Sequence, residues 1–136
     1  MIRISLFACL VLGSVAACGS PSKNRDLDGA DLYLSNCAIC HGLDARGGGG
    51  AGVAGLSKTP PDLTSLTARN GGEFPVDDVL EALEGYAAGG LRGRQMTPFD
   101  ALQSDRRKRV RLASGRVRTA RPVGDLLKYL EAIQTP

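Results

Sequence analysis

The stretch Cys37-Ala38-Ile39-Cys40-His41 decides how this chain folds and what it binds. Two thiols separated by two residues can add across the two vinyl groups of a haem, because this spacing places both sulfurs at one edge of the porphyrin. The adjacent His41 then presents an imidazole nitrogen to the iron from one face of the ring. The motif therefore predicts one covalently attached haem c, with its iron, held through Cys37 and Cys40.

Three other interpretations of the cysteine pair explain less. A thioredoxin-like redox pair needs a βαβ context, and no strand-like apolar run precedes Cys37. A zinc site needs four ligands and usually a second cysteine pair, whereas the chain has one His and no other such cluster. A disulfide between Cys37 and Cys40 is compatible with an exported protein but leaves His41 without a role.

A second axial ligand for the iron is sought among soft or imidazole side chains. His41 is the only His, and the only Met apart from Met1 is Met96. Met96 precedes Pro98, which stiffens the backbone, and Phe99, whose ring suits a porphyrin face. We therefore expect His41 and Met96 to bind the iron, although filling a gap in the core is the commoner role of a Met.

The N-terminus has the order of a secretory signal. Arg3 precedes an apolar stretch, 4–12, and small residues follow as far as Cys18. The apolar stretch is too short to span a bilayer. The run Val15-Ala16-Ala17-Cys18 is also typical of bacterial lipoproteins, in which the Cys is lipidated after cleavage. We expect a signal peptide at 1–17 and a lipid on Cys18, with a plain soluble secreted protein as the alternative.

This interpretation assigns all the cysteines and sets the boundaries of the chain. Cys9 leaves with the signal, Cys18 takes the lipid, and the haem pair remains. The polar run within 18–28 reads as a flexible tether, so the folded domain is expected at 29–136. The predicted location is periplasmic, with the protein held to a membrane by its lipid.

Size and composition are consistent with a single small domain. The chain has 136 residues, of which 43% are apolar and only 4% aromatic, without Trp. A haem would supply the buried apolar area that large aromatic side chains usually provide. Charge is divided unevenly: residues 1–91 carry 6 basic and 10 acidic groups, whereas residues 92–136 carry 11 and 4. Such asymmetry usually concerns a partner or a surface.

Apolar spacing and capping residues predict helices at about 29–36, after Thr59-Pro60-Pro61-Asp62, from Pro75 to Gly85, and at about 123–133. Leu126, Leu127, Leu130 and Ile133 form the apolar face of the last helix. The glycine-rich stretch 47–55 reads as a loop, because no strand precedes it and no Lys-Ser or Lys-Thr pair ends it.

Residues 29–135 resemble the bacterial monohaem class I cytochromes c, here of a lipoprotein type. The resemblance is carried by Gly29 and Tyr33 before the Cys-Ala-Ile-Cys-His motif, by segments 60–64 and 70–75, by Met96 ahead of Pro98-Phe99, and by Tyr129-Leu130. It implies a small all-α cytochrome c fold, with about four helices around the haem and the terminal helices crossing. It also implies that the carbonyl of Pro60 or Pro61 accepts a hydrogen bond from His41.

Two features depart from that family pattern. Thr97 separates Met96 from the following proline, and residues 102–122 form a basic insertion. Basic and apolar residues alternate there around Ser114-Gly115, which favours a small exposed hairpin. Export argues against nucleic acid as its partner. An acidic docking surface, anionic lipid and a plain solvated loop remain open.

The expected function is one-electron transfer in a membrane-associated respiratory or dehydrogenase chain. Ligation by His and Met fills both axial positions, which leaves no site for a small-molecule substrate, so we expect an electron-transfer protein with redox protein partners rather than an enzyme. Two alternatives remain. One is the cytochrome subunit of a larger oxidoreductase, and the other is a five-coordinate haem sensor or peroxidase-like protein.

Overall fold

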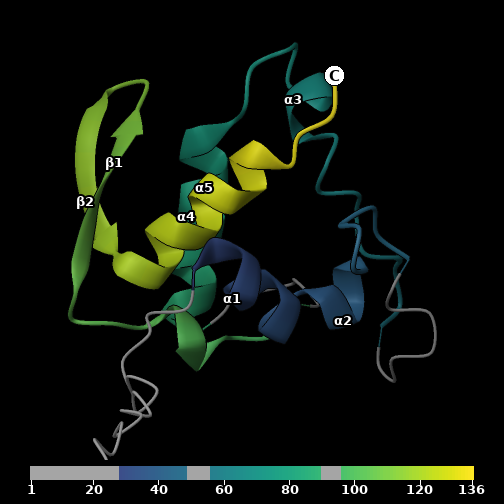
Figure 1. The fold of residues 1–136 in the computed structure, drawn as a ribbon, viewed down its shortest axis with the longest axis horizontal. Helices are drawn as coiled ribbons and strands as arrows, with labels where there is room; N and C mark the ends of the chain where they lie inside the picture. Colours follow the sequence, from purple (N-terminus) through teal and green to yellow (C-terminus); the bar gives the residue numbers. More distant parts are fainter. Residues whose placement is uncertain (1–27, 49–55, 90–95) are drawn as a thin grey trace, which may run out of the picture.

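The computed structural model describes residues 28–48, 56–89 and 96–136. The predicted signal peptide, the lipidation site Cys18, the tether as far as residue 27 and the glycine-rich stretch 49–55 lie outside these ranges. The described elements (Figure 1) are α1 (Gly29–Asn36), α2 (Ala38–His41), α3 (Leu66–Arg69), α4 (Val76–Ala87), the 3-10 helix η1 (Asp100–Leu102), β1 (Arg107–Leu112), β2 (Gly115–Ala120) and α5 (Arg121–Ala132).

The first and last helices pack closely against each other. The side chain of Asp28 caps α1 by accepting hydrogen bonds from the backbone N–H groups of Ala30 and Asp31. A Cβ atom at Gly29 would lie 2.1 Å from the carbonyl oxygen of Asp125, so only glycine permits this approach. The rings of Tyr33 and Tyr129 pack with their centroids 5.3 Å apart. The contact between the terminal helices that the resemblance implied is therefore present.

Helix α4 completes the core but is longer than the sequence indicated. It begins at Val76, directly after Pro75, as expected. The prediction that Gly85 ends it was wrong, because the helix continues to Ala87. Burial of Leu83 and Tyr86 on its inner face outweighs the cost of about 1 kcal/mol of a glycine within a helix.

The helix expected directly after the proline pair begins later than predicted. Only Leu66–Arg69 is helical, although the stop at Asn70 is as expected. The carboxylate of Asp62 accepts hydrogen bonds from the backbone N–H and the hydroxyl of Thr64, each at 2.7 Å. A side chain that bonds the backbone two residues ahead offers an alternative to the first helical turn. These two hydrogen bonds also lower the pKa of Asp62, and the bond from the hydroxyl of Thr64 has the larger effect.

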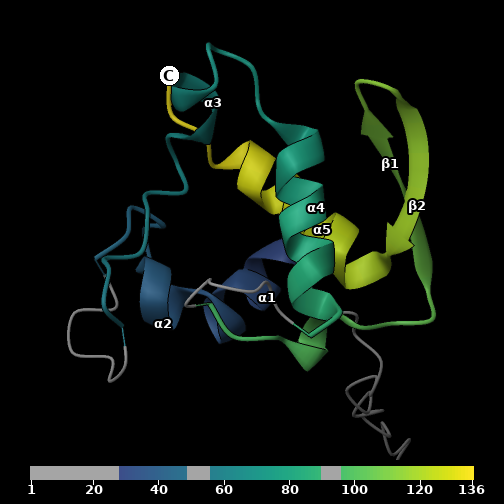
Figure 2. The same ribbon diagram turned by 180° about the vertical axis from the view of Figure 1, so that it is seen from behind.

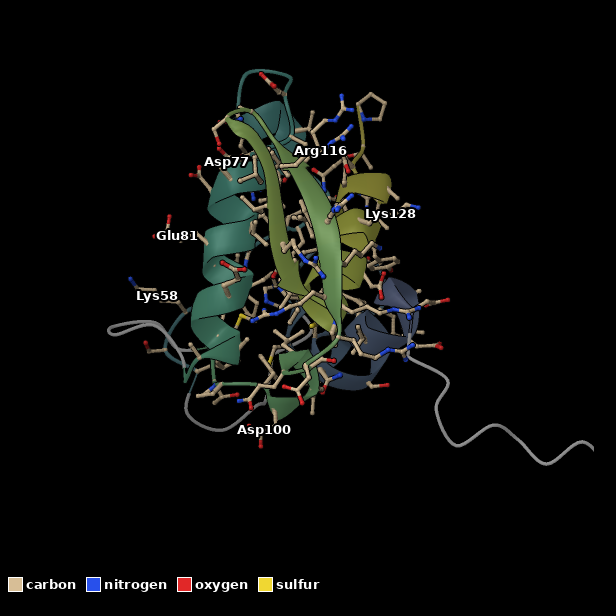
Figure 3. The ribbon with its side chains drawn as sticks, turned by 90° about the vertical axis from the view of Figure 1, so that its left-hand side faces the viewer. Lys58, Asp77, Glu81, Asp100, Arg116 and Lys128 are labelled. Atoms are coloured by element: carbon tan, nitrogen blue, oxygen red, sulfur yellow. The ribbon has the colours of Figure 1, made fainter. Side chains whose placement is uncertain are left out.

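The basic insertion forms the hairpin that the alternating pattern favoured. Strands β1 and β2 pair antiparallel and are joined by the two residues Ala113 and Ser114. Val110 and Leu112 are half-buried and pack against the core. The hairpin lies over α4 and α5 and forms one side of the molecule (Figure 3). The structure is thus mostly helical, with this two-stranded sheet added.

Helix α5 begins two residues before the predicted start, with Pro122 in its first turn, where a missing N–H costs nothing. It lies between the hairpin and α1, and α2 lies at the far side of the molecule from the hairpin in both opposed views (Figures 1 and 2). Among residues 28–48, 56–89 and 96–136, no helix has the length and apolarity needed to cross a bilayer.

Candidate functional site

The cysteine–histidine motif lies where α1 passes into α2. Cys37 is at once the C-cap of α1 and the N-cap of α2. The backbone N–H groups of Cys40 and His41 both donate to the carbonyl of Cys37, at 3.1 and 2.9 Å. Because residues three and four apart share one face of a helical turn, this conformation brings the two thiols and the imidazole together on one face.

The state of the cysteines argues against a thioredoxin-like pair. Neither Cys37 nor Cys40 forms a disulfide. Burial, and secondarily the neighbouring Cys40, raises the pKa of the free Cys37 thiol to about 11. A redox-active thiol needs a lowered pKa, so the raised pKa of Cys37 does not favour a redox-active pair. Within the described parts of the chain, no three His, Cys, Asp or Glu side chains are grouped as a metal site such as zinc would need.

One hydrogen bond orients His41. Its Nδ1 lies 3.2 Å from the carbonyl oxygen of Pro61. A carbonyl oxygen only accepts, so the proton is on Nδ1, and Nε2 keeps its lone pair for a metal. The ring is buried, and this burial lowers the pKa of His41, although the bond to Pro61 partly opposes the shift. Of the two prolines that the sequence left open, Pro61 is therefore the hydrogen-bond partner.

The second proline, Pro60, has a different place at the site. Its carbonyl oxygen would lie 2.3 Å from a Cβ atom at Gly47, whose φ is +81°. The backbone N–H of Gly47 donates to the carbonyl of His41 at 2.9 Å. Gly47 therefore lets the loop after His41 pass directly against the proline pair. The sequence indicates this glycine only as part of a loop.

The proline segment is fixed from two further sides. On one side, the N–H of Leu63 donates to the carbonyl of Ala45 at 2.7 Å. On the other side, Gln134 donates from its side chain to the carbonyl of Leu63 at 2.8 Å, and Thr135 donates its N–H to Thr64 at 2.8 Å. The C-terminal residues thus hold the segment that holds His41, a link that no local sequence signal indicates.

Tyr33 supports the site through a contact with the residue that follows His41, a contact that no signal in the sequence indicates. Its hydroxyl donates to the carbonyl of Gly42, at 2.6 Å, and Gly42 directly follows His41. The residue is fully buried, and this burial is the main cause that raises the pKa of Tyr33 to about 12. The hydroxyl therefore stays protonated and keeps donating throughout the neutral range.

Met96 is half-buried and packs against the hydrophobic core to which Cys37 and Ala38 belong. The described segment that it begins is tied to α4, because the N–H of Phe99 donates to the carbonyl of Tyr86 at 3.3 Å. Residues 90–95, which precede Met96 in the predicted ligand loop, lie outside the described ranges. The thioether is thus associated with the same core as the cysteine motif.

These side chains fit a covalently bound haem. Two thiols free of disulfide bonding and a histidine lie on one helical face, and the histidine is fixed in the tautomer that leaves Nε2 available. The loop around Gly47 leaves no space for a Cβ, which keeps the support of His41 close-packed. The polypeptide therefore offers two free thiols that could be attached to a haem and an imidazole oriented so that it could bind iron.

Comparison with known proteins identifies the family of the chain. No curated protein and no solved structure matches the chain. The family model for cytochrome c, however, matches residues 27–110, which is more than half of the sequence and includes α1, α2 and the proline segment. The chain therefore belongs to the cytochrome c family, and it is a haem-based electron carrier with covalently bound haem c.

Proposed function

We propose that this protein is a one-electron carrier of a membrane-associated respiratory or dehydrogenase chain, with its haem attached through Cys37 and Cys40 and its iron held by His41 and Met96. The observation that carries the proposal is the hydrogen bond from Nδ1 of His41 to the carbonyl of Pro61. It fixes the tautomer and the ring orientation of a buried imidazole, which is what an axial ligand requires.

The haem supplies reversible one-electron exchange between ferric and ferrous iron. The residues of the chain keep the surroundings of the iron constant during that exchange. Burial favours the neutral form of His41, and Pro61 keeps the proton on Nδ1, so Nε2 remains a ligand at neutral pH. Tyr33 holds the backbone just after His41. A support held at several points reduces the rearrangement that accompanies each electron transfer.

A five-coordinate sensor or peroxidase-like protein would need an open position on the iron. The packing of Met96 against the core that contains Cys37 favours the carrier, because a soft thioether is at hand for that position. The role of subunit in a larger oxidoreductase is compatible with the same site. A subunit differs from a free carrier only in that it stays bound to its redox partner.

Electron exchange is expected near α2, where the haem is attached. Two apolar side chains on this part of the chain are unusually accessible: Ile39 is 70% exposed and Leu43 is 80% exposed. Exposed apolar side chains next to a redox centre suit brief contact with a protein partner. The hairpin, which carries the basic residues, lies on the opposite side of the molecule from α2 (Figures 1 and 2). A partner with an acidic docking surface that bound the hairpin would therefore not cover the place where electrons are exchanged.

The test of the ligand set is the absorption spectrum of the reduced holoprotein with and without carbon monoxide. The wild type should bind carbon monoxide slowly or not at all, because Met96 occupies the sixth position. Met96→Leu should bind it readily and have a lower reduction potential, while the swap itself should cost less than about 1.5 kcal/mol of stability. Rapid and complete binding by the wild type would favour the sensor or peroxidase-like alternative.

Export and lipid anchoring form a separate part of the proposal. It rests on Val15-Ala16-Ala17-Cys18 and on the apolar stretch before it. Mass spectrometry of the mature protein should find acyl chains on an N-terminal Cys18. Cys18→Ser should remove the acyl anchor, so the protein should leave membranes that are washed at high salt, without a change in its haem spectrum. An unmodified N-terminus beyond Cys18 would contradict the anchor.

A further inference from the structure

The outer face of the hairpin is made of arginine. In a strand, alternate residues point to the same side, so positions 107, 109 and 111 of β1 share a face with 116 and 118 of β2. All five positions are Arg, and all five are exposed. Within the described parts of the chain, none of these five side chains forms an ion pair or a side-chain hydrogen bond.

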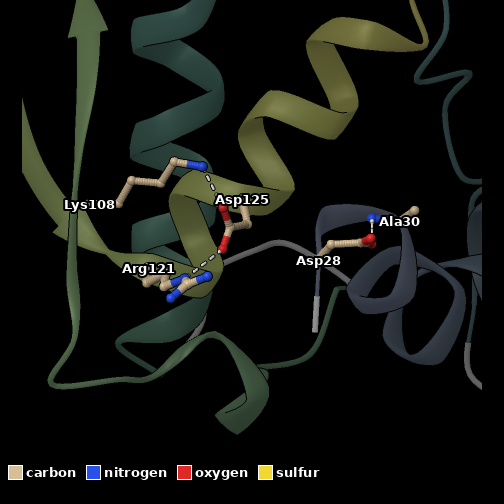
Figure 4. A network of polar contacts seen from close by, with 5 residues as sticks. All are labelled: Asp28, Ala30, Lys108, Arg121 and Asp125. Atoms are coloured by element: carbon tan, nitrogen blue, oxygen red, sulfur yellow. Dashed lines mark hydrogen bonds and ion pairs between the residues drawn. The ribbon is translucent and has the colours of Figure 1, made fainter. Parts of the chain in front are cut away.

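The opposite face of the hairpin packs onto the protein. Lys108 lies over Gly124 and forms an ion pair with Asp125 of α5, as Figure 4 shows. Thr119, from β2, is completely buried. The hairpin is therefore held against the helices by this face, and the arginine face is free for a partner.

The arginines face one another across the strands. Arg109 is paired with Arg118, and Arg111 with Arg116, at directly opposed positions of the ladder. Like charges at such positions destabilise a sheet. Neutral polar residues at these outward positions would avoid the repulsion and would leave the packing of the inward face unchanged. The arrangement is explained if the charges bind an anionic surface that offsets the repulsion.

The shape and composition of this face favour lipid over protein. The ladder places six residues of the two-stranded ribbon on this face, the five arginines and Ala120, so the face has no aromatic or large aliphatic side chain, whereas protein interfaces usually contain a buried apolar centre. Several arginines spread over one ribbon match a plane of many phosphates, to which each basic residue adds attraction. The distance from α2 also separates the face from the place of electron exchange (Figure 1).

The point where the chain enters the domain lies on the same side. Gly29 contacts Asp125, and Asp125 in turn binds Lys108 of β1, so the start of α1 is one helix away from the hairpin (Figure 4). Helix α1 runs from there toward α2 (Figure 1). The tether from Cys18 to Asp28 spans at most about 35 Å. An acylated Cys18 would therefore keep the start of α1 within this distance of the bilayer, which brings the neighbouring hairpin within reach of the lipid.

We propose that Arg107, Arg109, Arg111, Arg116 and Arg118 form a contact face for anionic phospholipid, which orients the domain with the haem attachment site directed away from the membrane. This inference rests on the proposed membrane association and adds the orientation to it. The phosphate groups of the lipid are the recognised chemistry, and the face needs no conformational change to meet them.

The first experiment places wild-type holoprotein in vesicles of phosphatidylcholine, with or without phosphatidylglycerol, and modifies arginines with phenylglyoxal. Mass spectrometry then gives the modification rate at each position. Phosphatidylglycerol should slow modification of the five hairpin arginines and leave Arg46 and Arg69 unaffected as internal controls. Raising the salt concentration should remove the protection. Equal rates in both kinds of vesicle would overturn the proposal.

The second experiment measures partitioning onto phosphatidylglycerol vesicles in the full-length Cys18→Ser background, which removes any acyl contribution. Arg109→Gln with Arg118→Gln should weaken partitioning about 30-fold. Replacing the same pair by Lys should preserve it. The matched control, Arg46→Gln with Lys58→Gln, removes two exposed charges on segments away from the hairpin and should change it little. Identical partitioning of the two Gln pairs would overturn the proposal.

Two further outcomes distinguish lipid binding by this face from binding of a protein partner and from the carrier proposal. Protection of the hairpin by an added acidic redox protein, but not by phosphatidylglycerol, would overturn the lipid assignment and give the face to a protein partner. The haem spectrum of the same samples tests the carrier proposal independently. A normal spectrum without any lipid dependence would reject the contact face and leave the carrier proposal standing.

Discussion

At the scale of single residues, the adjacent glycines Gly47 and Gly48 distinguish the cost of a left-handed backbone conformation from the cost of a steric clash. Both have a positive φ, +81° and +75°. A Cβ at Gly47 would meet the carbonyl oxygen of Pro60 at 2.3 Å, whereas nothing lies within 4 Å of a Cβ at Gly48. Alanine at either position incurs the cost of a left-handed conformation. Only alanine at position 47 also displaces the segment that supports His41.

We expect Gly48→Ala to lower the free energy of unfolding by about 1 kcal/mol, and Gly47→Ala to lower it by about 3 kcal/mol or more. Urea titration of the holoprotein gives both values. Gly47→Ala should also shift the reduction potential, because the bond between His41 and Pro61 is loosened. Equal effects of the two substitutions on stability and potential would show that the contact with Pro60 is unimportant.

The identity of the proline that supports His41 could not be read from the sequence. Pro60 and Pro61 are adjacent and chemically the same, and the choice depends on how the loop at Gly47 meets them. The tautomer of His41 likewise follows from the position of one carbonyl. The residue types of the site were predictable because each has a chemical role with haem. Their supporting contacts were not, because they are formed between distant segments.

At the scale of helices, the approach of α1 to α5 depends on Gly29. Gly29→Ala should gain helix propensity but force a Cβ to within 2.1 Å of a backbone oxygen of α5, so we expect a net loss of about 1 to 3 kcal/mol. Gly124→Ala is the matched control, since its nearest neighbour is the flexible side chain of Lys108 at 3.0 Å. It should be neutral or slightly stabilising by urea denaturation. A stabilising Gly29→Ala would mean that the helices do not meet at this glycine.

The link between α1 and α2 should depend on pH through Tyr33. Its pKa is about 12 in the folded chain, against an ordinary value of 10.0. The folded state therefore keeps a proton that the unfolded state loses between these values. The stability that this group contributes is complete below pH 10 and falls as the pH rises toward 12.

Tyr33→Phe removes the hydrogen bond to Gly42 and also the titrating group. At neutral pH the variant should be less stable by about 1 kcal/mol. The difference between wild type and variant should shrink between pH 10 and pH 12, because only the wild type loses stability there. Chemical denaturation monitored by far-UV circular dichroism at several pH values measures it. A difference that stays constant over this range would contradict the buried, proton-retaining hydroxyl.

The boundaries of the elements were predictable where local signals and packing agree. Helix α1 spans Gly29–Asn36 as predicted, because its cap and its buried face coincide. Helix α4 exceeds its predicted end because tertiary burial of Tyr86 outweighs the local effect of Gly85. The hairpin was predictable from the alternation of basic and apolar residues. Its position on α5 was not, because that depends on Lys108 meeting Gly124 and Asp125.

At the scale of the whole molecule, the hairpin and the helix α2 lie far apart along the longest axis (Figure 1). The cysteine–histidine motif at the start of α2 lies at one side, and the hairpin that carries the five arginines lies at the other (Figures 1 and 2). The sequence located the division of charge between the two parts of the chain, but not the distance between the basic face and the haem motif. That distance is the reason to assign electron exchange and membrane contact to different surfaces.

The central claim is that one haem is joined to this chain through Cys37 and Cys40 and is ligated by His41. The most direct test is mass spectrometry of the proteolytic peptide that contains residues 37–41, together with the absorption spectrum of the protein in alkaline pyridine. We predict a peptide heavier by one haem, with both thiols consumed, and a spectrum typical of two thioether bonds. In Cys37→Ala the spectrum should change to that of a haem with one thioether bond. A colourless peptide with two free thiols would contradict it.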